Sequence, residues 1–113
     1  MVNLKDDLEK LINIPVYYEG EAPQKLPSEY FTVSEDATGD NLNADNRALE
    51  HRYEFTLKWY TKDANRIYTG LQEAITLLLG IDYLIEGVGY KNETYQNTWF
   101  SRMVDVEKID YLT

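Results

Sequence analysis

The sequence predicts an α+β fold, a two-layer sandwich in which two helices cover one face of a mainly antiparallel sheet. Two segments, one near 4–13 and one between Asp63 and Gly80, carry apolar residues at helical spacing. In other segments large apolar residues alternate with polar ones, as in strands that bury one face. Because such helices and sheets bury their apolar surfaces against each other, the element order α-β-β-β-α-β-β gives two layers around one core.

Length and composition limit the possible classes of protein. A chain of 113 residues has the length of one domain, and we expect a single domain over 1–113. It has no Cys, which excludes disulfides and thiolate chemistry. A net charge of -9 disfavours binding to nucleic acid backbones and anionic lipids. No apolar run is long enough to span a membrane, and the start lacks the pattern of a secretory signal, so we expect no export.

The first predicted helix covers about 4–13. Asn3 is suited to cap its start, and Pro15 ends it by disfavouring helical geometry at Ile14. Its apolar face is formed by Leu4, Leu8, Leu11 and Ile12.

Two strands are predicted to follow. A short β-prone run, "PVYYEG", ends at Gly20, and the prolines of "EAPQKLP" indicate a turn or extended connection. Residues 29–35, "EYFTVSE", form the second strand. The polar segment 36–47, "DATGDNLNADNR", has few apolar residues and is predicted to be a surface loop.

The strongest signal is a third strand with a strict period of two. Its buried face is predicted to comprise Tyr53, Phe55, Leu57 and Trp59. Asp63 then caps a second helix, which is predicted to end at Gly80 in a left-handed conformation. We expect this helix to connect distant or edge positions of the sheet.

Two further strands complete the predicted sheet. The fourth covers 81–90, where Gly87 and Gly89 indicate a bulge or a close backbone approach. A polar hairpin loop, "KNETYQN", leads to the fifth strand in 98–112, in which Phe100, Val104 and Val106 share a face interrupted by Arg102. From Glu107 onward the pattern is mixed.

The residues that usually carry catalysis are scarce. His51 is the single histidine, and no serine lies in a nucleophile motif, so we do not expect an enzyme or a cofactor. Acidic residues in the polar segment could indicate a calcium-binding loop. The spacing of an EF-hand is not met, however, because Leu42 occupies the third position counted from Asp40 and no glycine follows at the sixth. Ten tyrosines, with Trp59 and Trp99, favour protein interfaces as well as core packing.

Several stretches together resemble the tail completion proteins of long-tailed bacteriophages, also called tail terminators or tail-to-head joining proteins. These stretches are "LPSEYFTVSE", the segment "LNADNRALEHRYEFTLKWYTKD" with the helix after it, and a last strand that opens with "FSR". The resemblance implies a structural subunit without catalysis, which forms a hexameric ring, caps the tail tube and docks onto the head connector. It implies location in the virion, at the head-tail interface, and in the host cytoplasm during assembly.

By the same resemblance, the polar loop would contact a neighbouring subunit or the connector. The predicted contact residues are Asp40, Asn41, Asn43, Asp45, Asn46 and Arg47. Two alternatives remain open: a minor capsid or connector-stopper protein of the same junction, and a small ligand-binding or metal-binding α+β module. The first would share the lack of catalysis, whereas the second would need convergent polar groups in a concave site.

Overall fold

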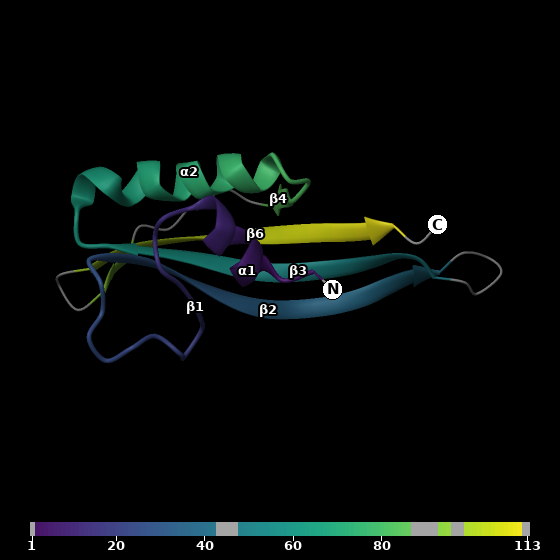
Figure 1. Cartoon of the computed structure of the whole chain (residues 1–113), viewed down its shortest axis with the longest axis horizontal. Helices are drawn as coiled ribbons and strands as arrows, with labels where there is room; N and C mark the ends of the chain where they lie inside the picture. Colours follow the sequence, from purple (N-terminus) through teal and green to yellow (C-terminus); the bar gives the residue numbers. More distant parts are fainter. Residues whose placement is uncertain (1, 43–47, 87–92, 96–98, 112–113) are drawn as a thin grey trace.

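The structure is a computed structural model, and Figure 1 shows its arrangement of two helices on one face of a long sheet. It describes the backbone of residues 2–42, 48–86, 93–95 and 99–111, and the side chains of 2–36, 51–86 and 99–110. The helices are α1 (Leu4–Leu11) and α2 (Ile67–Leu79), with a short 3-10 turn, η1 (Ala64–Arg66), before α2. The strands are β1 (Val16–Tyr18), β2 (Glu29–Leu42), β3 (Ala48–Thr61), β4 (Leu84–Glu86), β5 (Glu93–Tyr95) and β6 (Trp99–Tyr111).

The described strands form one mixed, mostly antiparallel sheet. Its order is β1-β2-β3-β6-β4, and β5 pairs with β6 beside this path. The predicted α+β class and element order are confirmed, with α2 connecting β3 to the edge strand β4. β1 departs from the mainly antiparallel pattern of the prediction, because it pairs in parallel with β2. Residues 19–28 give the chain enough length to return and run in the same direction.

The central hairpin is much longer than predicted. β2 continues to Leu42 and β3 begins at Ala48, so residues 36–42 are a strand and not a surface loop. The prediction failed because it relied on apolar residues, which this segment lacks. Its backbone is instead held by pairing with β3, from Glu29↔Thr61 to Leu42↔Ala48, with two irregularities of register.

The end of the chain differs from the prediction in two ways, while β6 matches the fifth strand predicted in 98–112. β4 covers only Leu84–Glu86 of the predicted 81–90, and Gly87 and Gly89 lie outside the described residues. β5 lies within the segment predicted to be a polar loop, and it pairs with the start of β6. β6 extends through the mixed segment after Glu107, because β3 supplies partners as far as Tyr111.

Local hydrogen bonds explain the helix ends. The Asn3 side chain accepts a hydrogen bond from the backbone N–H of Asp6 at 3.1 Å, which confirms the predicted cap of α1. Asp63 caps η1, directly before α2. The prediction of a left-handed Gly80 is wrong, since its φ is -66°.

The reversal after α2 lies two residues further on. Asp82 has a φ of 69°, and its N–H donates to the carbonyl of Leu79 while the N–H of Tyr83 donates to that of Leu78. These two bonds are the pair that defines a Schellman motif. A Schellman motif is usually accompanied by an apolar contact across the turn, and the buried Leu78 and Tyr83 occupy the two positions concerned. Tyr83, the residue after the left-handed Asp82, is therefore part of the core.

The core lies between the helices and one face of the sheet. Phe55, Leu57 and Trp59 are buried on β3, as the alternation predicts, and Tyr53 is half-buried at the border. The largest fully buried side chain is Trp59. Its ring packs 4.6 Å from that of Phe31 between centroids, and its indole N–H donates to the carbonyl of Arg66 at 3.1 Å.

Gly70 allows α2 to approach Trp59 closely. A Cβ atom at Gly70 would lie 2.1 Å from Cζ2 of the buried indole, far inside van der Waals contact. The first turns of α2 are therefore held against β3 by the lack of a side chain at one position.

We expect Gly70→Ala to destabilise the protein by about 3 kcal/mol, because either the helix or the indole must move out of a close-packed core. Chemical denaturation measures this change. Thr76→Ala, at an exposed position of the same helix, is the matched control and should change stability by less than about 0.5 kcal/mol. An equal stability of Gly70→Ala and the parent would contradict this packing.

Candidate functional site

The sheet extends beyond the layer of helices. In Figure 1, β2, β3 and β6 continue past the end of α2, and the molecule measures 54 × 25 × 23 Å. We call this part the arm, and define it as residues 38–42 of β2, 48–53 of β3 and 108–111 of β6. Register fixes its rows: Thr38, Tyr53 and Lys108 lie side by side, as do Asp40, His51 and Asp110.

Both edges of the arm lack a neighbouring strand among the described residues. On one side β1 pairs only with 31–33 of β2, which leaves 34–42 uncovered. On the other side β5 and β4 pair with 99–101 and 105–107 of β6, which leaves 108–111 uncovered. Uncovered edges present backbone N–H and C=O groups that can pair with another chain.

Two of the predicted contact residues lie in this arm. Asp40 and Asn41 are strand residues of β2, paired with His51 and Glu50. Asn43, Asp45, Asn46 and Arg47 lie outside the described residues. Their role as contacts stays a prediction, but the two described members belong to an edge strand instead of a loop.

A hollow of about 460 Å³ borders the uncovered edge of β6. Among its lining residues, Leu79 and Leu84 are half-exposed, at 51% and 48%. The left-handed Asp82 contributes to the same wall. Its lining consists of Leu79, Asp82, Tyr83, Leu84, Lys108 and Ile109.

Acidic side chains line the face of the sheet opposite the helices. Glu54 of β3 lies directly opposite Glu107 of β6, and Glu86 of β4 lies opposite Asp105. Like charges at such positions repel each other. The Thr56 hydroxyl donates to Asp36 at 2.5 Å, which brings a fifth carboxylate to this face.

Glu107 is the buried member of this group of carboxylates, with 3% of its surface exposed. Burial raises the pKa of its carboxyl group, and the hydrogen bond and charge of Glu86 act in the same direction. Arg52, whose Nε lies 3.0 Å from Glu107, opposes the shift. The net effect favours the neutral form of Glu107 in the folded protein.

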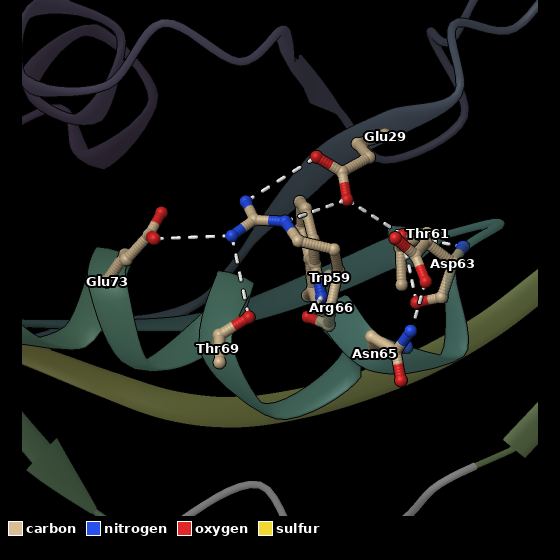
Figure 2. Close-up of polar contacts among 8 residues, drawn as sticks. All are labelled: Glu29, Trp59, Thr61, Asp63, Asn65, Arg66, Thr69 and Glu73. Carbon is tan, nitrogen blue, oxygen red and sulfur yellow. Dashed lines mark hydrogen bonds and ion pairs between the residues drawn. The ribbon is translucent and has the colours of Figure 1, made fainter.

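The other end of the sheet is held by an ion-pair cluster, shown in Figure 2. Arg66 lies between Glu29 of β2 and Glu73 of α2, at 3.1 and 3.2 Å. The buried Thr61 hydroxyl donates to Glu29 at 2.8 Å and accepts from the N–H of Asp63. The pKa of Arg66 is raised by its bonds to Glu73 and Glu29. These contacts join α2 to the first residue of β2.

Sequence reasoning missed this cluster. Glu29 and Arg66 are 37 residues apart, and neither belongs to a recognisable motif. Only the pairing of Glu29 with Thr61 in the β2–β3 register brings them together. The cluster has a clear structural role, since it closes the turn between β3 and α2.

A larger hollow than the one beside β6 lies on the helix layer and not at the arm. It measures about 820 Å³, and Tyr68 on its rim is 57% exposed with the guanidinium of Arg102 over its ring. The lining comprises Leu11, Ile12, Asn13, Tyr68, Thr69, Gln72, Glu73, Thr76 and Leu77. These are mainly exposed side chains of two helices, so the hollow is an open groove between them.

The described residues contain neither a metal-binding cluster nor a membrane-spanning helix. No group of three or more His, Asp or Glu side chains within this part of the chain is placed to hold a metal ion. No helix within it is long and apolar enough to cross a bilayer, and the longest, α2, has 13 residues. In the comparisons with known proteins, no protein-family model and no curated protein matches the chain.

We expect Glu107→Gln to raise the thermal midpoint at pH 7 to 8, because the folded protein then need not hold a buried carboxylate. Because the folded protein favours the protonated form of Glu107, this form stabilises the fold in full below the ordinary carboxyl pKa of about 4.3. The stabilisation is lost as the pH rises through the raised pKa of Glu107 in the folded protein. The gain of the variant over the parent should therefore shrink towards pH 4. Thermal unfolding from pH 4 to 8 measures it, and a gain that grows on acidification would contradict the sign.

Proposed function

We propose that this chain is a structural subunit of a bacteriophage tail, which assembles into a ring that caps the tail tube and joins the tail to the head connector. The observation that carries the proposal is the arm, a three-stranded extension of the sheet with an edge on each side that no described strand covers. A subunit with two different free edges can bind one neighbour on each side. Such contacts lead to rings when the rotation between copies closes.

The stretches that resemble tail completion proteins include parts of β2, β3 and β6, the strands whose far ends form the arm, and of these parts Leu42 and residues 48–53 belong to the arm itself. "EYFTVSE" opens β2, "ALEHRYEFTLKWYT" is β3, and "FSR" lies near the start of β6. The resemblance and the geometry therefore concern the same three strands. This supports assembly through the sheet as the function of the subunit.

The charge of the chain suits a ring through which DNA passes. A net charge of -9 and an acidic row across the sheet lower its affinity for phosphate backbones. The same charge makes copies repel each other, so assembly should strengthen when salt screens the repulsion.

Mass photometry and light scattering after size exclusion test the ring directly. We expect a discrete oligomer that increases with protein concentration and with salt, and closed rings in negative-stain images. Added to terminator-free tail tubes of the phage that encodes the chain, the rings should bind at one tube end. A strict monomer at millimolar concentration and high salt, which also fails to bind tubes, would contradict the proposal.

We expect the double substitution Asp40→Ala and Asp45→Ala to change the stability of the monomer by less than about 1 kcal/mol while weakening assembly. The reason is that Asp40 belongs to the arm, which extends beyond the helix-covered core. Chemical denaturation and mass photometry give the two values.

The matched control is Glu9→Ala with Glu21→Ala, which removes the same charge at exposed positions outside the arm. Equal assembly of the two double variants would show that only net charge matters. A large loss of stability in the arm variant would assign these residues a structural role.

A further inference from the structure

We infer that neighbouring copies join by extending the sheet: the uncovered edge of β2 in one copy pairs, in parallel, with the uncovered edge of β6 in the next. The segments are residues 38–42 and 108–111. The inference rests on the proposed ring and names the surfaces that form it.

The two segments lie at the same level of the arm. β3 is paired with both, so Thr38 shares a row with Lys108, and Asn41 shares one with Tyr111. One irregularity of register, at Glu35/Ala37, precedes the β2 segment, and a second, at Asn41/Leu42, lies near its end. Such bulges bend a strand and limit regular pairing, so the regular part of the segment, 38–41, has the same length as 108–111 of β6.

The directions of the strands make these edges complementary between copies. β2 and β6 are both antiparallel to β3 and therefore run in the same direction. Rotation about an axis along the strands keeps that direction, and it brings β2 of one copy beside β6 of the next. Because the two edges differ, every copy uses one of each, and a series that closes into a ring leaves neither arm edge unpaired.

The edge of β6 also has apolar surface for a partner to cover. Leu79 and Leu84 remain half-exposed beside Lys108 and Ile109, around the hollow of about 460 Å³. Asp82, at the same place, has a left-handed φ that non-glycine residues adopt less readily. A strand added along residues 108–111 would close this hollow from outside, and backbone pairing would supply direction while the leucines supply buried area.

The native lack of cysteine allows a direct test by cross-linking. The main variant combines Asp40→Cys with Asp110→Cys, and a second combines Asp40→Cys with Lys108→Cys to sample a shifted register. Within one copy β3 separates these edges by two strand spacings, about 10 Å, which is too far for a disulfide. Any disulfide in either double variant therefore joins two copies.

We expect mild oxidation of at least one double variant to give a ladder of covalent oligomers that ends at the size of the ring. Each single variant should stay monomeric on a non-reducing gel, since cysteines then occupy only one kind of edge. The matched control, Asp40→Cys with Met103→Cys, places the second cysteine at an exposed position of β6 outside the free segment, and it should give no ladder.

A charge substitution tests the apolar part of the contact. Leu84→Lys should raise the protein concentration needed for assembly at least about tenfold. Met103→Lys, at a similarly exposed apolar position, should leave it unchanged.

The outcomes separate this inference from the proposed function. Rings that form without covalent ladders, and that tolerate Leu84→Lys, would overturn edge pairing and leave the ring intact. Covalent dimers of the Asp40→Cys single variant would show pairing of β2 with β2, which also overturns it. The lack of any assembled species in mass photometry, with no ladder, would contradict both.

Discussion

The contact between Trp59 and Gly70 fixes where the helices lie on the sheet. The indole fills the space beneath the first turns of α2, its N–H binds the carbonyl of Arg66, and the lack of a side chain at Gly70 allows the close approach. Because α2 starts there, its 13 residues end near Lys108, where the Lys108 ammonium donates to the carbonyl of Ile81. The strands continue beyond this point, so the position of one indole determines how much of the sheet becomes the arm.

Polar contacts stabilise the helix-covered end of the sheet, where Trp59 and Gly70 lie. Arg66 joins Glu29 and Glu73, and buried Thr61 satisfies both Glu29 and the backbone of Asp63. Such hydrogen-bonded ion pairs, partly shielded from water, contribute more to the stability of the fold than exposed ion pairs do. The two ends of the sheet therefore differ: one is covered and cross-linked by side chains, and the other is held by backbone pairing between three strands. That difference makes the arm the part suited to contact other chains.

The sequence predicted the features that depend on apolar periodicity. The cap at Asn3, the buried face of β3 and the two-layer order are all present, because each is set by residues close together in the chain. Residues 36–42 were missed as a strand, since they are polar and are held by β3 through backbone bonds that leave no sequence pattern. The end of α2 was placed at a glycine, although the buried Tyr83 sets the reversal at Asp82. The predicted contact loop thus became, in part, an edge strand.

The account depends on the idea that the arm is completed by another copy of the chain. Amide hydrogen exchange, followed from dilute to concentrated protein, tests this most directly. We predict that protection increases with assembly in residues 38–42 and 108–111, while the core strand segments around Leu57 and Val104 stay equally protected throughout. Assembly that leaves exchange in both arm segments unchanged, and protects the open groove between the helices instead, would contradict the account.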